Sequence, residues 1–372
     1  MLFRSMVEGK YIKNVSQLIK LELCPPPLRT FSKQVAEVGG IVRNEGSRGC
    51  AWGRCSFCAI QHKYCNETQW RPVSIQRVIQ ELQELSEIGI KSPFYTDEDF
   101  IGNDPIRAIK LAEEILKEKA AGTIDKAMSL YVDMRVDSIL SKSHKGLPSG
   151  KHVLEILKKS GLREVFIGIE SGAKEQVKRY KKASTAHRNS IVLDVLDELG
   201  ITYDIGFIMF DPEMNIQELT DNISFLKDTG LNKHDARMTK SLRIEPGTPL
   251  VKEYSDKEMI SGTLDIDNLI YPYRWKHSQT QDVYEIYSEW ERELSDEVYT
   301  IQASTRGEID SEELRKERRF MLGLIRETEL SALEYITTQI SNGLEVNKAE
   351  LQRLQDVRNE GVFSASRTMK IA

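Results

Sequence analysis

The sequence lacks any run of about 18 consecutive apolar residues, the length that a membrane-spanning helix needs. Its first ten residues have no apolar core of the kind found in signal peptides. Only five cysteines are present, three of them bunched together, so they do not form a disulfide framework. The net charge of -5 over 372 residues argues against nucleic acid as an obligatory partner. We therefore expect a cytoplasmic protein whose cysteines persist as thiolates.

Three of the cysteines form a closely spaced motif, Cys50-x4-Cys55-x2-Cys58, in a glycine-rich loop. Three thiolates can hold three irons of a cubane cluster and leave the fourth iron open to a small ligand. The same spacing also suits a zinc knuckle in which His62 or Cys65 supplies a fourth ligand, because structural zinc takes four nitrogen or sulfur donors. The motif alone leaves both metal groups open.

Predicted strands and helices alternate from residue 39 to about residue 250, which indicates a parallel sheet covered by helices. Apolar residues recur at helical spacing behind caps such as Ser74, and short apolar runs separate these stretches. The expected strands lie at 39–42, 91–96, 127–132, 164–169, 202–210 and 238–244, and the expected helices at 75–89, 104–119, 152–159, 190–199 and 215–228. This pattern predicts an α/β fold, a partial (β/α)6 TIM-type barrel, because no strand pattern closes the barrel with two further units.

The cysteine loop and two strand ends resemble those of the radical S-adenosylmethionine (SAM) superfamily. The loop has one residue more between its first two cysteines than the usual C-x3-C-x2-C of that family. The predicted fourth strand ends in Glu170-Ser171-Gly172, which is similar to the family's G-x-E-S-G strand end. The second strand ends in Asp97-Glu98-Asp99-Phe100, and a later turn reads Pro246-Gly-Thr-Pro249; both are most like the cobalamin-linked branch. The resemblance covers residues 40–250.

The resemblance implies a site at the carboxyl ends of the strands, where barrels collect their chemistry. It implies that the cluster ligands are Cys50, Cys55 and Cys58. The residues implied to contact SAM are Phe57, Asp97, Glu98, Glu170, Ser171 and Lys182. From the residues alone, Asp97 and Glu98 could equally cap the next helix, and Lys182 could be an ordinary surface lysine. The sequence assigns no catalytic side chain.

Membership of this family would imply reductive cleavage of SAM at a [4Fe-4S] cluster, with a partner such as flavodoxin or ferredoxin supplying the electron. The resulting 5′-deoxyadenosyl radical would abstract hydrogen from a small-molecule or natural-product substrate, for rearrangement, dehydration, epimerisation or oxidation. A cobalamin-assisted methyltransferase and an RNA- or peptide-modifying enzyme are the alternatives within the family. A non-enzymic zinc-binding module is the alternative from a different class. Substrate identity, the fate of SAM and the oligomeric state do not follow from the sequence.

We expect three regions along the chain: a lead-in and linker at 1–38, the radical SAM partial barrel at 39–250, and a mainly helical extension at 251–372. The linker contains Pro25–Pro27 and resembles a segment that follows a cobalamin-binding domain in one branch. Because too little chain precedes these prolines for such a domain, bound cobalamin is not favoured. Cys24 and Cys65 lie outside the motif, and we expect packed thiols rather than hydrogen-atom donors.

The last third of the chain is charged and has helical periodicity. Helices are expected at 282–298, 310–342 and 347–361. Asp310, with Glu313 three residues later, predicts the cap of the second of these helices. The aromatic and basic residues at 271–276 would suit an RNA contact surface, because bases stack on aromatic rings.

Overall fold

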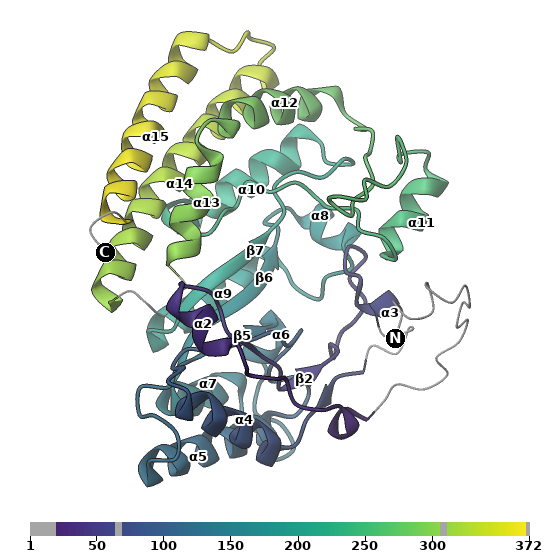
Figure 1. Ribbon diagram of the computed structural model, residues 1–372. Helices are drawn as coiled ribbons and strands as arrows, with labels where there is room; N and C mark the ends of the chain where they lie inside the picture. The colour runs from purple at the N-terminus through teal and green to yellow at the C-terminus, as the bar shows by residue number, and fades with distance from the viewer. Residues whose placement is uncertain (1–19, 64–68, 306–310, 370–372) are drawn as a thin grey trace, which may run out of the picture.

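A parallel β-sheet lies at the centre of the chain in the computed structural model, which describes residues 20–63, 69–305 and 311–369 (Figure 1). Within these residues the sheet has five strands, in the order β1-β4-β5-β6-β7, and every neighbouring pair is parallel. The strands are β1 (Arg43–Asn44), β4 (Phe94–Tyr95), β5 (Leu130–Met134), β6 (Leu162–Glu170) and β7 (Thr202–Phe207). A separate antiparallel pair consists of β2 (Ser47–Arg48) and β3 (Arg71–Pro72). The predicted α/β partial-barrel fold is confirmed.

The predicted sixth strand is reduced to a single bridge. Residues 238–244 pair with the end of the sheet only through the parallel bridge between Phe210 and Ser241. The backbone N–H groups of Met209 and Phe210 both donate to the Lys240 carbonyl, at 2.8 and 3.2 Å. The chain then turns, and the Thr248 N–H donates to the Glu245 carbonyl at 3.2 Å. Strand pairing therefore does not extend beyond this bridge. The expectation of a full sixth strand is therefore wrong.

The helices between the strands begin at side chains that suit helix N-termini. Ser74 accepts a hydrogen bond from the Arg77 N–H, and Asp104 accepts one from the Arg107 N–H. Asn215 forms a capping box with Glu218. The helices that follow the strands are α4 (Ile75–Glu87), α5 (Pro105–Ala121), α7 (Gly150–Ser160), α9 (Ala186–Leu199) and α10 (Ile216–Asp228). These bounds match the predicted helices to within a few residues, because caps and apolar spacing agree.

Shorter elements complete the barrel region. They are η1 (Leu21–Leu23), α2 (Ser32–Glu37), α3 (Ile60–Lys63), α6 (Val136–Ile139), α8 (Lys174–Arg179), η2 (Leu231–Lys233) and α11 (Pro249–Asp256). Figure 1 shows α4, α5 and α7 together on one side of the sheet and the C-terminal helices on the other. None of the helices in the described residues combines the length and apolar character required to span a lipid bilayer.

Four helices form the C-terminal region: α12 (Ser278–Arg292), α13 (Ser295–Ser304), α14 (Glu312–Ser341) and α15 (Lys348–Met369). The helix predicted at 282–298 is split, because Leu294 adopts a left-handed conformation with φ of +57°. Ser311 caps α14 by accepting from the Leu314 N–H, whereas the predicted cap Asp310 lies outside the described residues. α15 continues past Gly361, where the sequence predicted its end. A methyl group at Gly361 would lie 3.1 Å from Ile325 of α14, so the glycine lets α14 and α15 pack closely.

The C-terminal helices share one hydrophobic core with the barrel. Leu330, Leu333 and Ile336 of α14 belong to the same buried cluster as Val165 of β6 and Leu226 of α10. At Gly323, an added Cβ would lie 2.3 Å from the Lys233 carbonyl oxygen, so the glycine lets α14 approach η2. The extension is therefore packed against the barrel.

The aromatic cluster expected as an RNA contact surface is partly buried. The rings of Tyr273 and Trp275 meet edge to face with centroids 5.6 Å apart, and Trp275 packs on Tyr284 of α12 at 4.9 Å. Tyr271 and Tyr273 also pack against a small buried cluster around Tyr254. These rings are occupied with one another, so they offer little free surface for stacking bases.

A buried ion-pair network joins α14 to α15. Glu329 pairs with Arg326 at 2.6 Å and with Arg358 at 2.9 Å, and all three side chains are at most 6% exposed. Burial alone would raise the pKa of Glu329, but the two guanidinium groups hold it below its usual value. Removal of one partner from such a network leaves uncompensated buried charge.

We expect Glu329→Gln to lower the free energy of unfolding by about 3–5 kcal/mol, because two buried guanidinium groups lose their shared carboxylate. Urea denaturation checks this. The control is Glu350→Gln, which removes the exposed Glu350–Arg353 pair of α15, also three residues apart, and should leave the unfolding midpoint unchanged. Equal effects of the two substitutions on the free energy of unfolding would contradict the conclusion that Glu329 balances two buried charges.

Candidate functional site

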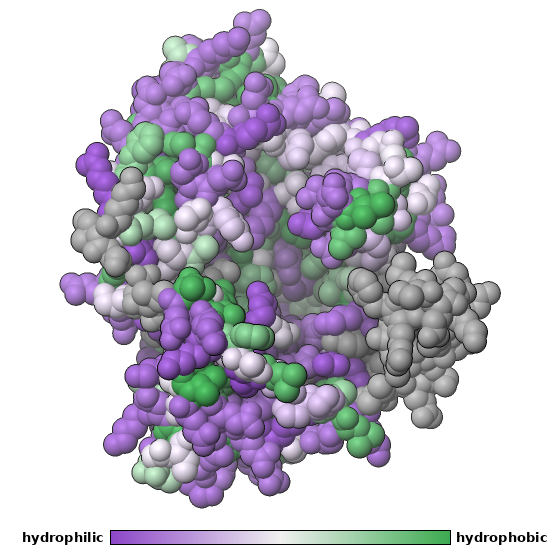
Figure 2. All heavy atoms as spheres, in the orientation of Figure 1, coloured by the Kyte–Doolittle hydropathy of each residue, from purple (hydrophilic) through white to green (hydrophobic). Residues whose placement is uncertain are grey.

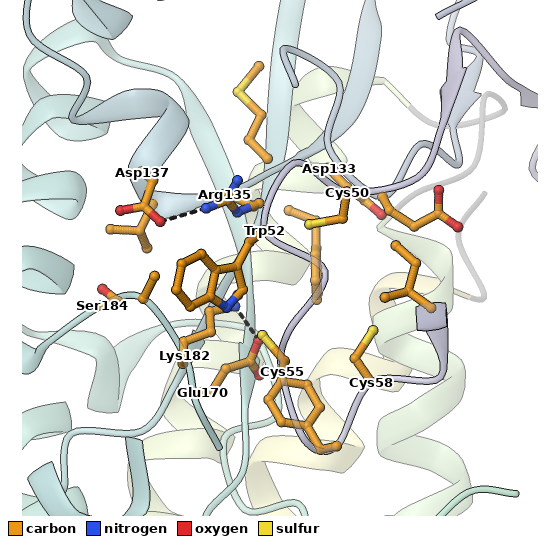
Figure 3. Close-up of a pocket in the computed structure, with 18 residues that line it drawn as sticks. Cys50, Trp52, Cys55, Cys58, Asp133, Arg135, Asp137, Glu170, Lys182 and Ser184 are labelled. Atoms are coloured by element: carbon orange, nitrogen blue, oxygen red, sulfur yellow. Dashed lines mark hydrogen bonds and ion pairs between the residues drawn. The ribbon is translucent and has the colours of Figure 1, made fainter. Parts of the chain in front are cut away.

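A pocket of about 230 Å³ opens at the carboxyl ends of the strands. Its walls come from the cysteine loop, from the ends of β5 and β6, and from the segment after α8 (Figure 3). Figure 2 shows the face drawn there hollowed near its centre, between the barrel helices below and the C-terminal helices above. The pocket therefore lies where a β/α barrel places its chemistry.

Hydrogen bonds hold the start of the cysteine loop against the end of β4. The Asp97 carboxylate accepts from the Gly46 N–H and from the Ser47 hydroxyl, both at 2.7 Å. The neighbouring Glu98 carboxylate accepts from the Gly49 N–H at 2.8 Å. Gly49 has a φ of +92°, a conformation that favours glycine, and it directs the chain into Cys50. The two acidic residues at the end of β4 thus fix the entry to the loop.

The end of the loop is held by the last residue of α8 and by the segment that follows it. Ser56 donates from its N–H to the Tyr180 carbonyl and from its hydroxyl to the Arg179 carbonyl, both at 3.0 Å. Phe57 meets the Tyr180 ring edge to face, with centroids 5.2 Å apart. The Leu250 N–H donates to the Ser56 carbonyl at 3.1 Å. Both ends of the loop are therefore anchored.

The three thiols between these anchors face the same pocket. Cys50, Cys55 and Cys58 are each partly buried and free of disulfide bonds. Burial raises the pKa of Cys55 to about 12, with Lys182 opposing the shift, and burial also raises the pKa of Cys58. Without a metal, the thiols of Cys55 and Cys58 are therefore neutral at physiological pH.

Three soft sulfur donors around one cavity suit an iron–sulfur cluster, because a metal group stabilises the thiolate form. Across residues 20–63, 69–305 and 311–369, no three His, Cys, Asp or Glu side chains are gathered closely enough for a single ion. The zinc alternative needed His62 or Cys65 as a fourth ligand; Cys65 and the side chain of His62 lie outside the described residues. The donor chemistry of the residues present thus fits the cluster.

An ion pair at the end of β6 forms the floor of the pocket. Lys182 Nζ lies 2.9 Å from Glu170 Oε1, and the two side chains are 13% and 12% exposed. Burial alone would lower the pKa of Lys182, but the Glu170 carboxylate holds it above its usual value. A Cβ at Gly168 would lie 2.4 Å from Glu170 Oε1 and 2.7 Å from Lys182 Nζ, so a larger residue there would displace the ends of both side chains. Lys182 is not an ordinary surface lysine.

Four of the six residues predicted to contact SAM line this pocket, namely Phe57, Glu98, Glu170 and Lys182. Asp97 does not, because its buried carboxylate is used by the cysteine loop. Ser171 does not either. Its hydroxyl donates to Gln176 Oε1 at 2.7 Å and accepts from the Ala173 N–H at 2.9 Å, which shapes the turn after β6.

The pocket also contains polar residues that the sequence reading missed. Asp133 at the end of β5 and Arg135 and Asp137 just after it line the pocket, and in Figure 3 Arg135 and Asp137 lie across from the cysteines. Arg135 pairs with Asp137 at 2.6 Å, and Asp137 is also held by Arg188 at 2.6 Å. The signal was present, because alternating polar residues directly follow a buried strand. Trp52, between the first two cysteines, was missed as well and lines the pocket.

The lining holds more carboxylates than cations, but cations outside it pair with two of these carboxylates. Its ionisable side chains other than cysteine are four carboxylates and two cations, namely Glu98, Asp133, Asp137 and Glu170 against Arg135 and Lys182. Thiolates would add further negative charge. Because Lys63 pairs with Glu98 at 2.5 Å and Arg188 with Asp137 at 2.6 Å, the excess negative charge that favours a cationic ligand would come from the thiolates.

Comparison with known sequences identifies a family. Residues 44–226 match the sequence profile described as the radical SAM superfamily. The chain is 33% identical over 239 residues to 4′-phospho-dehydrooxetanocin synthase of Priestia megaterium. This alignment covers 59% of this chain and 30% of that protein. It is 28% identical over 169 residues to hopanoid C-3 methylase of Methylococcus capsulatus, covering 45% of this chain and 28% of that protein. The chain thus spans less than a third of the length of these two relatives.

Solved structures share the fold. OxsB, described as a cobalamin-dependent S-adenosylmethionine radical enzyme with aqua-cobalamin bound, aligns with a TM-score of 0.75 at 21% identity over 99% of this chain and 63% of that chain. TsrM of Kitasatospora setae, a radical S-adenosylmethionine methyltransferase with cobalamin and a [4Fe-4S] cluster bound, aligns with a TM-score of 0.54 at 14% identity over 84% of this chain and 63% of that chain. At these identities the likeness shows the architecture alone.

The anchoring of the cysteine loop predicts a pH-dependent stability. Burial raises the pKa of Asp97 to about 7, whereas an unfolded aspartate titrates near ~3.9. A raised carboxyl pKa stabilises the fold fully below about pH 4, and this contribution is lost as the pH rises through about 7. We expect Asp97→Asn to flatten the pH dependence of the free energy of unfolding between about pH 4 and pH 7, in urea titrations.

The matched control is Asp265→Asn, in an exposed turn, which should leave the slope in that window as it is in the wild type. A slope that Asp97→Asn leaves unchanged would contradict the buried, raised-pKa carboxyl at the base of the loop.

Proposed function

The chain belongs to the radical SAM superfamily and is an enzyme, and from this premise we propose that it cleaves SAM reductively and uses the product to abstract hydrogen from a small-molecule substrate. The single observation that carries the proposal is that three cysteine thiols and the Glu170–Lys182 pair line one pocket at the strand ends. When bound, a [4Fe-4S] cluster supplies one electron to the sulfonium of SAM, which releases methionine and a 5′-deoxyadenosyl radical.

Three thiolate ligands are the basis of this proposal. Cys50, Cys55 and Cys58 would hold three irons of the cluster, which leaves one iron for the amino and carboxylate groups of SAM. The loop is hydrogen-bonded at Gly46, Gly49 and Ser56, so the thiols are held at the pocket before a ligand arrives. This arrangement limits the reorganisation that binding requires.

The remaining pocket residues suit the charges of SAM. With its cysteines as thiolates the pocket would carry net negative charge, which favours an ammonium and a sulfonium. Glu98 and Glu170 supply acceptors for the ammonium, and Lys182 supplies a donor for the carboxylate. Phe57 adds an apolar wall beside the cysteines. Asp97 and Ser171 would not contact SAM themselves. Asp97 would act by holding the cysteine loop and Ser171 by shaping the turn after β6.

The substrate would meet the wall formed by Arg135 and Asp137. These side chains could donate to and accept from a polar small molecule, while the apolar parts of the pocket exclude water. The likeness to a 4′-phospho-dehydrooxetanocin synthase supports a small-molecule or natural-product substrate. We further propose that residues 39–250 form the SAM-cleaving core, that 251–372 cover it, and that 1–38 lead into it. A flavodoxin or ferredoxin in the cytoplasm would supply the electron.

Cobalamin-assisted methyl transfer is the second candidate function. It is supported by the hopanoid C-3 methylase and by the cobalamin-bound OxsB and TsrM structures. RNA modification is less well supported, because the rings of Tyr273 and Trp275 are packed against their neighbours.

The proposal predicts that anaerobically reconstituted protein binds about four irons per chain and releases 5′-deoxyadenosine from SAM under reduction. Cys55→Ala should abolish iron binding, because a cluster ligand is lost, while Cys24→Ala, outside the motif, should not. Iron analysis and chromatographic product analysis check both statements. One zinc per chain, with no reductive cleavage, would refute the proposal.

Titration with hydroxocobalamin separates the two candidate functions. Hydrogen abstraction without a corrinoid predicts no stoichiometric uptake by this chain, as followed in the visible spectrum of the corrinoid. SAM cleavage should proceed equally with and without the added compound. Tight uptake of one corrinoid per chain, or methyl transfer that depends on it, would favour the methyltransferase instead.

A further inference from the structure

Trp52 occupies the spacer between the first two cysteines of the motif. The spacer reads Ala51-Trp52-Gly53-Arg54, and Gly53 has a φ of +56°. Together with the left-handed Gly49, this turn projects the indole out of the loop and into the pocket wall. In Figure 3 the ring lies centrally, above Lys182 and between Arg135 and the cysteines.

The indole makes one directed contact with another segment of the chain. Its Nε1–H donates to the Lys181 carbonyl at 2.9 Å. The Arg54 guanidinium lies 5.2 Å from the centre of the ring, a distance at which a cation is attracted to the aromatic face. The ring is therefore fixed on the spacer side by Arg54 and on the far side by Lys181.

The residue that accepts this hydrogen bond has an unusual backbone. Lys181 has a φ of +51°. Glu170, which forms the ion pair with Lys182, has a φ of +66°. Six non-glycine residues of the described chain have a positive φ, and two of them flank this pocket. Such conformations persist only where the surroundings enforce them, and they cluster at functional sites. The hydrogen bond from Trp52 is one of the contacts that hold the backbone of Lys181 in this conformation.

Hydrogen bonds from the cysteine loop reach three consecutive carbonyls of the same segment. The Ser56 hydroxyl donates to Arg179, the Ser56 N–H to Tyr180, and Trp52 to Lys181. Lys182 is the next residue, and its ammonium enters the pocket. The position of the cysteine loop is thereby linked to the position of Lys182, and Trp52 makes the link nearest to it.

We propose that Trp52 is a positioning residue, which holds the Lys181–Lys182 segment so that the Lys182 ammonium meets the carboxylate of SAM. The inference rests on the proposed function, because it takes SAM as the ligand. It assigns a task to the four-residue spacer, whose indole reaches across the pocket to the segment after α8.

The test compares two substitutions that each remove one indole N–H. Trp52→Phe loses the bond to the Lys181 carbonyl, whereas Trp290→Phe loses a similar bond from α12 to the Leu351 carbonyl at 3.1 Å. Equilibrium dialysis of the reconstituted proteins with SAM, together with iron analysis, gives the readout. We expect Trp52→Phe to raise the Kd of SAM about two- to tenfold at wild-type iron content, the effect of one hydrogen bond. Trp290→Phe should leave both values unchanged.

A double-mutant cycle tests whether Trp52 acts through Lys182. Lys182→Met should weaken SAM binding, and adding Trp52→Phe to it should weaken binding no further, because the positioned group is already absent. Trp52→Leu, which removes the donor and the ring, should raise the Kd at least as much as Trp52→Phe. Additive effects in the cycle, an unchanged Kd, or a loss of iron in proportion to the loss of binding would each overturn the positioning role.

The two proposals fail separately. Wild-type reconstituted protein that binds no SAM would overturn the proposed function. Wild-type protein that binds SAM, with a Trp52→Phe variant of equal affinity, would overturn only the role of Trp52.

Discussion

Hydrogen bonds at both ends of the cysteine loop hold three thiols at the rim of the barrel, and the other features of the site depend on that restraint. The Asp97 and Glu98 carboxylates fix the entry, and the carbonyls at and after the end of α8 fix the exit. A loop of this length with free ends would sample many conformations, and metal binding would have to order it. Here the barrel supplies the order before any ligand is present.

The same contacts connect groups that are distant in the sequence. Asp97 lies at the end of β4, yet its carboxylate serves the loop after β1. Lys182 follows α8, yet its charge is balanced by Glu170 at the end of β6. The cost of burying the charges of Lys182 and Glu170 is offset by their ion pair, whereas the hydrogen bonds of Asp97 offset only part of its cost and its pKa stays raised. The C-terminal helices share the barrel core and have a buried ion-pair network of their own.

Much of this architecture can be predicted from the sequence. Cap residues such as Ser74 and Asp104 and the spacing of apolar residues locate the barrel helices, because both are local signals. The three cysteines and the Glu170-Ser171-Gly172 strand end indicate the pocket for the same reason. The sixth strand could not be predicted, because pairing depends on the register of distant residues, and only Ser241 reaches the bridge.

Side-chain direction was the harder part of the site. Asp97 and Glu98 are adjacent in the sequence, but only Glu98 lines the pocket, because neighbouring side chains at a strand end point to different sides. Lys182 has the sequence context of a surface lysine, and its burial depends on Glu170, twelve residues earlier. Arg135 carries a signal that can be recognised only once the end of β5 is known to face the cavity.

The account depends on one iron that the protein leaves for SAM. Electron–nuclear double resonance on the reduced, reconstituted protein, with SAM labelled by 15N at its amino group and 17O at its carboxylate, measures this directly. The account predicts magnetic coupling of the cluster to both labels. Absence of both couplings, with a fourth ligand from the polypeptide on that iron, would contradict it.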